Sequence, residues 1–273
     1  MELSVIKIGG NIIDDEEKLQ SFLVSFAAVP GKKILVHGGG KLATDLAARL
    51  QIPQQKVEGR RITNKETLDI VTMVYAGLIN KKISAKLQSL QCNVLGLSGA
   101  DANIILAHKR SVTASGIDYG YVGDIDHVSS QTIHDLLRNF DAIVIAPITH
   151  DGEGQLLNTN ADTIAKEVAI GMSNTNSVKL IYCFEKNGVL MDVEDDKSVI
   201  PAITPELYTA LLKEKNKKGE PIIADGMIPK LTNALATVEA GVKAVVIGNA
   251  MELGRLLSGA GGTTIKKSSN DVV

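Results

Sequence analysis

Two glycine-rich loops hold the residues best suited to chemistry. One follows an apolar run and reads Lys-Ile-Gly-Gly at positions 7–10; the other reads His-Gly-Gly-Gly-Lys at positions 37–41. Glycines let backbone N–H groups approach an anion closely, and a helix that starts at such a loop adds its positive N-terminal end. Lys7 ends a predicted parallel strand, at the edge where doubly wound sheets bind ligands. Together the loops predict a site for a phosphate or a carboxylate.

The loop at 37–41 does not match the fingerprints of other common sites. The spacing G-x-x-x-x-G-K-[ST] of a Walker A loop is absent, and no G-x-G-x-x-G opens a helix elsewhere. The sequence His-Gly-Gly-Gly also occurs in hydrolase oxyanion holes, which require a G-x-S-x-G nucleophile elbow. The nearest stretch, residues 96–99, lacks that spacing. A hydrolase is therefore disfavoured.

Two later loops place charged side chains at predicted helix starts. Asn160 is a candidate N-cap, and Asp162 is an acid in the first turn, which the helix dipole favours. This helix-starting role alone accounts for both residues. Lys230 lies just inside another helix, where a cation is unfavourable unless an anion compensates. A ligand phosphate would supply that anion.

The elements that must position these loops alternate between short apolar runs and helical periodicity. Continuous, mostly β-branched runs predict strands buried on both faces, and their alternation with helices predicts an α/β fold with a parallel sheet. The predicted strands span 5–8, 34–36, 94–97, 142–148, 178–184 and 244–247. The predicted helices span 16–26, 41–50, 65–78, 131–137, 161–169, 205–213 and 229–240.

Two segments break this alternation. Between about 101 and 128 the runs are short and separated by Gly, Asp and Asn, which predicts hairpins. We expect this segment to form a lid over the N-terminal half. The last residues, 266–273, show no periodicity and are expected to be a disordered tail.

The composition of the chain limits the kinds of partner that we expect for it. The 273 residues carry 29 Lys+Arg against 31 Asp+Glu, and only 3% are aromatic, so a nucleic-acid partner is not expected. Cys92 and Cys183 lie in apolar runs without a Cys or His at metal-ligand spacing, so they are expected to be reduced core residues and no metal site is expected. No signal peptide and no stretch of 18 apolar residues is present, which predicts a cytoplasmic protein with no membrane partner.

Several of these motifs, in this order, resemble the amino acid kinase family over about residues 3 to 265. They are the segments 7–10, 37–40, 59–63 (Gly-Arg-Arg-Ile-Thr) and 158–162 (Asn-Thr-Asn-Ala-Asp), and 225–227 (Asp-Gly-Met) leading to Lys230. The resemblance implies a three-layer αβα sandwich with a central, mostly parallel sheet. It also implies one domain, residues 1–265, with an acylglutamate-binding N-lobe of about 1–170 and a nucleotide-binding C-lobe of about 171–265.

Within the family, the sequence is similar to the branch that phosphorylates N-acylated glutamates. The resemblance implies ATP-dependent phosphorylation of the γ-carboxylate to an acyl phosphate, in arginine biosynthesis. Lys7 and Lys230 would neutralise the transferring phosphoryl group, and Asp162 would hold both lysines. Backbone N–H groups would receive the γ-carboxylate, and side chains would bind the α-carboxylate and the acylamide. The first role falls to Gly38 and Gly39, and the second to Arg61 and Asn158.

The resemblance places ATP on the C-terminal half, with Mg²⁺ carried by the nucleotide phosphates and water. The implied contacts are Gly9, Gly10, Glu185, Lys186, Asn187, Gly188, Val189, Leu190, Ile222, Ile223 and Ala224. Here the sequence departs from its relatives, which usually have Asp, a small segment and then Gly after this strand. Gly188 keeps the turn, but the purine contacts carried onto Glu185 and Lys186 depend on a changed loop.

Arg60 is a second departure, because the family generally has an apolar residue before the substrate-binding arginine. An apolar neighbour suits an acetyl methyl, as in N-acetyl-L-glutamate, whereas a second guanidinium suits an acyl chain with its own carboxylate, as in N-succinyl-L-glutamate. Successive side chains of an extended segment face opposite sides, so Arg60 facing solvent is the alternative.

Other functions and assemblies stay open at this point. Another carboxylate kinase of the same fold, or a non-catalytic sensor of amino acids or nucleotides, would use the same scaffold. Arginine-sensitive hexameric relatives carry a helix before the first strand, and six residues precede Lys7 here. We therefore expect a homodimer, joined through helices such as 65–78, without inhibition by arginine.

Overall fold

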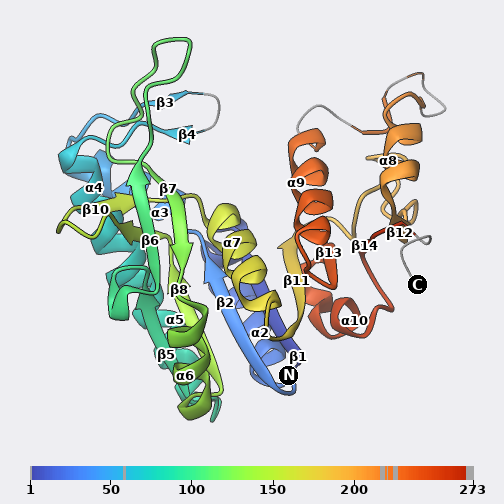
Figure 1. Ribbon diagram of the computed structural model, residues 1–273, viewed down its shortest axis with the longest axis horizontal. Helices are drawn as coiled ribbons and strands as arrows, with labels where there is room; N and C mark the ends of the chain where they lie inside the picture. The colour runs from blue at the N-terminus through green and yellow to red at the C-terminus, as the bar shows by residue number, and fades with distance from the viewer. Residues whose placement is uncertain (1, 58–59, 216–218, 220, 224–226, 269–273) are drawn as a thin grey trace.

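The computed structural model describes residues 2–57, 60–215, 219, 221–223 and 227–268, and its centre is an eight-stranded sheet (Figure 1). Neighbouring strands run parallel except β13 and β14, which are antiparallel. In spatial order the strands are β12 (Ala202–Ile203), β14 (Thr263–Ile265), β13 (Ala244–Asn249), β11 (Ser177–Phe184), β1 (Glu2–Ile8), β2 (Lys32–His37), β8 (Ala142–Ala146) and β5 (Val94–Ser98).

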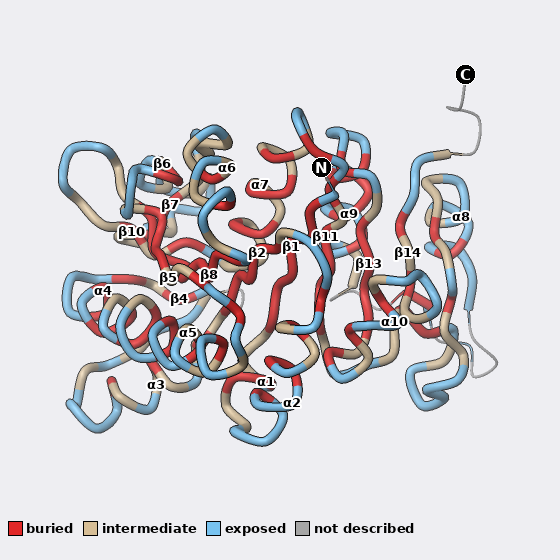
Figure 2. Tube along the Cα trace, turned by 90° about the horizontal axis from the view of Figure 1, so that it is seen from below, coloured by how far each residue is buried: buried red, intermediate tan, exposed pale blue. Residues whose placement is uncertain are grey.

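Helices cover both faces of this sheet, as the view from below in Figure 2 shows. One core cluster lies against α6 (Ser130–Asn139), α7 (Ala161–Ser173), α8 (Pro205–Leu211) and α9 (Ile228–Glu239). The other lies against α1 (Gly10–Ile13), α2 (Glu16–Ala27), α3 (Gly40–Arg49), α4 (Lys65–Val71), α5 (Asn80–Ser89) and α10 (Leu253–Ser258). The predicted αβα sandwich is therefore confirmed.

The continuous apolar runs explain why the sheet is central. In β1, every residue from Leu3 to Ile8 is buried, and alternate side chains enter the two different core clusters. Val5 packs on the α7 side and Ile6 on the α2 side. Strands of this kind need cover on both faces, which the crossover helices provide.

Two predicted elements differ in extent. The run 142–148 is divided by Pro147, which has no N–H for a ladder, so β8 ends at Ala146 and β9 (Ile148–His150) joins another sheet. The helix predicted over 65–78 instead continues to Ser89 and includes a π-helix, Thr72–Ile79, between α4 and α5. Helical periodicity alone does not reveal such a change of hydrogen bonding.

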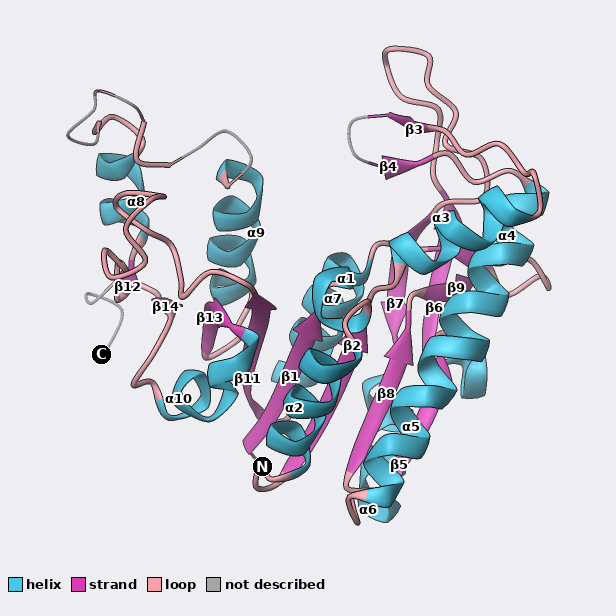
Figure 3. Ribbon diagram, turned by 180° about the vertical axis from the view of Figure 1, so that it is seen from behind, coloured by secondary structure: helices cyan, strands magenta, loops and turns pink. Residues whose placement is uncertain are grey.

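A smaller sheet of four strands lies beside the first half of the large one. Its order is β10 (Leu156–Asn158), β9, β6 (Ile105–Lys109) and β7 (Gly123–Val128). The predicted hairpin is formed by β6 and β7, which are antiparallel, and residues 111–114 between these strands form a loop. The loop between these strands and the short pair β3 (Lys56–Val57) and β4 (Arg60–Arg61) project beyond the carboxyl ends of the central strands (Figures 1 and 3).

The remaining described elements are two 3₁₀ turns, Asp101–Asn103 and Ala250–Glu252. Residues 266–268 form no helix or strand, and the rest of the predicted tail, 269–273, lies outside the described residues. None of the helices in the described part of the chain has the length and apolar character needed to span a membrane.

Candidate active site

Lys7 and Asp162 meet at the carboxyl edge of the central sheet. Lys7 lies near the end of β1, between β2 and β11, and is 8% exposed. Its Nζ lies 2.8 Å from Oδ1 of Asp162 in the first turn of α7. Asn160 caps this helix by accepting hydrogen bonds from the N–H groups of Asp162 and Thr163. The cap and the buried strand thus fix both ends of the ion pair.

Lys230 approaches the same place from the other side. Its Nζ lies 4.7 Å from the centre of the Phe184 ring, and Nζ of Lys7 lies 5.8 Å from the same centre, so one aromatic ring contacts both cations. A cavity of about 190 Å³ is lined by Asp162, Phe184 and Lys230. Among the described residues no ion pair joins Lys230 to Asp162, so Asp162 holds Lys7 but not both lysines, in contrast to the expectation.

A larger cavity, of about 480 Å³, extends from the first glycine loop to the loop after β11. Its volume is in the range of small-molecule sites. Gly9, Gly10 and Lys230 are among its lining residues and much of the rest of the lining is apolar, which suits phosphates beside the glycines and the lysine and a base against the apolar side chains. Its lining includes Gly9, Gly10, Glu185, Lys186, Gly188, Val189, Leu190, Ile222 and Ile223.

Two of the residues predicted to contact the nucleotide are not among the described residues that line this cavity. Asn187 does not line this cavity; its amide donates to the Asp196 carbonyl (3.2 Å), and its Oδ1 accepts from Asn249 (3.1 Å). Ala224 lies outside the described residues, as do Asp225, Gly226 and Gly59 of the predicted motifs.

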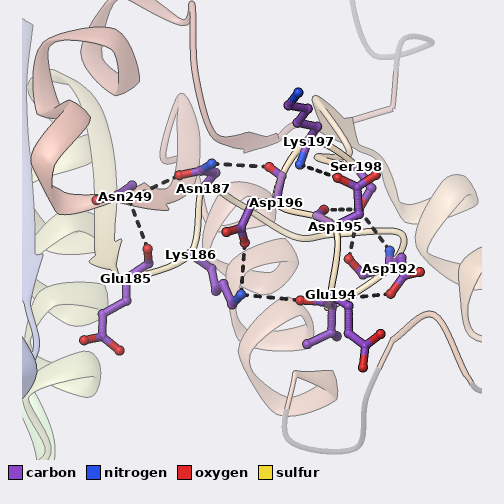
Figure 4. Close-up of polar contacts among 11 residues, drawn as sticks. Glu185, Lys186, Asn187, Asp192, Glu194, Asp195, Asp196, Lys197, Ser198 and Asn249 are labelled. Atoms are coloured by element: carbon purple, nitrogen blue, oxygen red, sulfur yellow. Dashed lines mark hydrogen bonds and ion pairs between the residues drawn. The ribbon is translucent and has the colours of Figure 1, made fainter.

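The loop after β11 is held by its own polar residues, as Figure 4 shows. Lys186 Nζ lies 2.9 Å from Oδ1 of Asp196, and Asn249 donates to the Glu185 carbonyl at 3.0 Å. At Gly188, a Cβ atom would lie 2.8 Å from both Thr263 and Val199, so only glycine fits this turn. The changed residues Glu185 and Lys186 therefore help to hold the loop and also line the cavity.

A third cavity, of about 260 Å³, lies over the second glycine loop. The structure brings together here every residue that the sequence predicted for the acylglutamate. These are Gly38, Gly39, Arg60, Arg61 and Asn158. Gly40, Lys56, Tyr75 and Arg110 also line it and were not predicted.

The glycine loop differs from the expectation in which N–H groups it offers. The N–H of Gly38 donates to the Ile8 carbonyl of β1 at 3.2 Å, because the ladder between β1 and β2 continues past His37. The donors left for a ligand are those of Gly39, which precedes α3, and Gly40, its first residue. Gly39 has φ of 142°, which favours glycine.

Arg61 is buried and held before any ligand arrives. Its Nη2 donates to the Gly40 carbonyl at 2.8 Å and to Thr44 Oγ1 at 2.9 Å, and its Nη1 donates to Gln54. Asn158 donates to Thr63 Oγ1 at 3.0 Å. These contacts present a fixed cation and a fixed amide to the cavity.

Arg110 was missed because it lies in the hairpin segment, which the sequence marked only as a lid. It forms a bidentate ion pair with Asp124, with Nε at 3.1 and 3.0 Å and Nη2 at 2.5 Å from the carboxylate oxygens. This pair lowers the pKa of Asp124 and raises the pKa of Arg110. A cross-strand pairing of the two segments was the signal that could have found it.

Fold and cavities together define an α/β protein with two large cavities at the carboxyl edge of a mostly parallel sheet, and with Lys7 and Lys230 close to one aromatic ring at that edge. Residues 2–249 match the sequence profile of the amino acid kinase family. The chain belongs to this family.

Individual relatives agree with this assignment. The chain is 52% identical to the acetylglutamate kinase of Cytophaga hutchinsonii, over 94% of this chain and 95% of that protein. It is 50% identical to the acetylglutamate kinase of Phocaeicola vulgatus, over 97% of this chain and 99% of that protein. A solved N-acetylglutamate synthase from Neisseria gonorrhoeae, complexed with coenzyme A and N-acetyl-glutamate, superposes with a TM-score of 0.76 at 21% identity, over 98% of this chain and 60% of that chain. The last comparison concerns the fold alone.

Proposed function

We propose that the protein is an ATP-dependent kinase of the γ-carboxylate of an N-acylated L-glutamate, N-acetyl-L-glutamate in the first place, in arginine biosynthesis. The relatives of about half identity are acetylglutamate kinases along nearly their whole length, which supports this reaction. The observation that carries it is the arrangement of Lys7, Asp162 and Lys230 between the two large cavities. Amino-acid biosynthesis also supports a cytoplasmic location.

The reaction needs position and charge more than covalent chemistry. An oxygen of the γ-carboxylate attacks the γ-phosphorus of ATP; the new O–P bond forms as the bond to the bridging oxygen breaks, and ADP leaves with the electron pair. No base is required, because the carboxylate is ionised at neutral pH. Lys7 and Lys230 stabilise negative charge on the transferring group, which is the main contribution a protein makes to such a transfer. Asp162 keeps Lys7 in place.

The two substrates occupy the two large cavities. In this proposal ATP lies in the cavity of about 480 Å³, with its phosphates toward Gly9, Gly10 and Lys230 and its base among the apolar residues. When bound, Mg²⁺ comes with the nucleotide and shares its charge with the phosphates and water. The acylglutamate lies in the cavity of about 260 Å³, with its γ-carboxylate at Gly39 and Gly40 and its α-carboxylate at Arg61.

The charge of the smaller cavity bears on the acyl group. Among the described residues, its lining holds four cations and no carboxylate; the cations are Lys56, Arg60, Arg61 and Arg110. The Asp124 carboxylate balances the charge of Arg110, which leaves three cations of the lining for a ligand. N-acetylglutamate brings two carboxylates, whereas N-succinylglutamate brings three. This observation favours N-succinyl-L-glutamate as a second candidate substrate.

We propose a division of the chain that follows the cavities. Residues 1–170 form the acylglutamate-binding lobe, with the segment 101–128 as its lid, and residues 171–265 form the nucleotide-binding lobe.

A homodimer through the helical run 65–78 fits the exposed apolar side chains there, since Met73 is 54% and Leu78 48% exposed. Light scattering of the protein and of the double variant Met73→Asp, Leu78→Asp tests it; a monomer mass for the unchanged protein contradicts the dimer.

A coupled assay of ADP release tests the activity. N-acetylglutamate, N-succinylglutamate and free glutamate are compared at equal concentration, with trapping of the acyl phosphate by hydroxylamine to distinguish transfer from ATP hydrolysis. We expect trapped product from at least one acylated compound and much less from glutamate. Product from a different carboxylate alone indicates another kinase of this fold, and binding without product indicates a sensor.

A further inference from the structure

We infer that His37 and Asn80 are positioning residues, which hold the peptide between Gly38 and Gly39 so that the Gly39 N–H faces the acylglutamate cavity. This inference rests on the proposed function, because it assigns the reason for a fixed donor at that place. Neither side chain lines the cavity. Both act through the glycine loop.

His37 holds the carbonyl side of this peptide. It ends β2 and is fully buried, and its Nδ1 lies 2.8 Å from the Gly38 carbonyl oxygen. In a trans peptide, the C=O of one residue and the N–H of the next point in opposite directions. Holding the Gly38 oxygen against a buried ring therefore turns the Gly39 N–H the other way, toward the cavity that Gly39 lines.

Without this hold, the loop would have two accessible states. Gly38 and Gly39 have no side chains to resist rotation of the peptide between them. In the flipped state a carbonyl oxygen would face the substrate carboxylate and repel it, and the donor would be lost. A preorganised donor matters because it needs no reorientation during the reaction.

Asn80 fixes His37 in the state that can donate. The side chain of Asn80 is fully buried at the start of α5, and its Nδ2 lies 3.0 Å from the Val144 carbonyl, 3.2 Å from the Leu97 carbonyl and 3.3 Å from Nε2 of His37. Two carbonyl acceptors require the NH₂ group on this side. An amide nitrogen cannot accept a hydrogen bond, so Nε2 of His37 carries no proton and shares the two N–H groups of Asn80 with the two carbonyls. The ring proton is therefore on Nδ1 and points to the Gly38 oxygen.

The ring is also kept neutral. Burial lowers the pKa of His37 to about 4, so a single proton occupies the ring at physiological pH. Lys81 extends this network, because its Nζ donates to Asn80 Oδ1 at 3.2 Å and to the Gly96 carbonyl at 2.7 Å.

The surrounding structure reserves space for this arrangement. A Cβ atom on Gly96 would lie 2.3 Å from Asn80 Oδ1, so β5 needs glycine where Asn80 passes. A Cβ atom on Gly39 would lie 2.1 Å from Ile79, at the end of the π-helix that precedes Asn80. The end of the π-helix therefore places two consecutive residues against the loop: Ile79 contacts Gly39, and Asn80 contacts the His37 ring.

The test uses two substitutions of one residue. The amide of asparagine can place a nitrogen near the position of Nδ1, so His37→Asn keeps a donor to Gly38, whereas His37→Leu removes it. We expect kcat/KM for the acylglutamate to fall roughly 10²-fold or more in His37→Leu and less than about tenfold in His37→Asn. The KM for ATP should change less than about threefold in both. His127→Leu, at an exposed position of β7, is the matched control.

The outcomes separate this inference from the proposed function. No transfer by the unchanged protein with any acylglutamate rejects the proposed function itself. Transfer by His37→Leu within about threefold of the unchanged protein, or an equal loss in His37→Asn, overturns only the positioning role. If His37→Leu does not fold, nitrogen NMR of the unchanged protein decides: a proton on Nδ1 supports the inference, and a proton on Nε2 overturns it.

Discussion

Nζ of Lys7 lies 2.8 Å from Oδ1 of Asp162, although the two residues are far apart in the sequence and belong to a strand and a helix start. The Lys7 side chain is 10% exposed and that of Asp162 42%, so the pair lies at the wall of the site. Lys230 contacts the same Phe184 ring, and within the described part of the chain no ion pair links it to Asp162. The carboxylate thus restrains Lys7 through an ion pair, while Lys230 is placed beside it by the shared aromatic ring.

This difference between the lysines predicts the effect of removing Lys230. Lys230→Ala should lower turnover by roughly 10² or more, because a charge that stabilises the transferring group is lost. Lys166→Ala is the matched control, since Lys166 lines the same cavity of about 190 Å³ but pairs with Glu167 at 3.1 Å. Steady-state kinetics with saturating ATP measures both. Unchanged turnover in Lys230→Ala would reject its catalytic role.

The buried histidine predicts a pH dependence of stability. The pKa of His37 is about 4 in the folded protein and 6.5 when exposed, so between these values the unfolded chain binds more protons. The free energy of unfolding should therefore fall as pH drops from 6.5 toward 4, by about 3 kcal/mol in total from this group. Its contribution is fully present above pH 6.5.

Urea unfolding at several pH values between 7.5 and 4.5 measures this contribution. His37→Asn cannot titrate there, so its free energy of unfolding should fall less steeply than that of the unchanged protein. His127→Asn, at an exposed position, should keep the original slope. Equal slopes for the unchanged protein and His37→Asn would show that His37 does not titrate as its burial requires.

Much of the fold could be predicted from hydrophobic patterning, because strands buried on both faces leave a plain signal. The positions of Lys7 and the two glycine loops followed from the rule that ligands bind at the carboxyl edge of such a sheet, whereas Asp162 was predicted from the residues only as a first-turn acid and was assigned to the site by the family resemblance. Patterning did not show that Pro147 moves residues 148–150 to another sheet, or that residues 72–79 form a π-helix. Both depend on hydrogen bonds, which hydrophobicity does not report.

The candidate site could be predicted from the sequence only for residues whose type alone determines their chemistry, such as the charged side chains. Whether a glycine N–H is free depends on the neighbouring strand, so the use of Gly38 by Ile8 could not be read from the motif. Arg110 enters the cavity only because β6 and β7 pair, and that register was not known. Long-range pairing, rather than local sequence, decides both.

Gly39 provides a prediction about strain. Its φ of 142° is unfavourable for any side chain, and an added Cβ would overlap Ile79. Gly39→Ala should therefore lower the free energy of unfolding by about 1–3 kcal/mol. Gly40→Ala is the control, because the nearest atoms to its Cβ lie at 3.9 Å and alanine favours the helix that Gly40 begins. Denaturant unfolding distinguishes them, and equal stability of the two variants would contradict the argument.

We predict that Arg60 determines which acyl group the site prefers. Arg60 is exposed on β4, next to the buried Arg61, yet it lines both the cavity of about 260 Å³ and the cavity of about 190 Å³ that Lys230 also lines. If an acyl carboxylate reaches it, Arg60→Leu should lower kcat/KM for N-succinylglutamate by roughly 10- to 100-fold, the effect of losing a hydrogen bond to a charged group. The value for N-acetylglutamate should change little. Lys56→Leu removes another cation from the same cavity and shows whether general charge suffices. An unchanged ratio of the two kcat/KM values in Arg60→Leu would mean that Arg60 faces solvent and does not select the acyl chain.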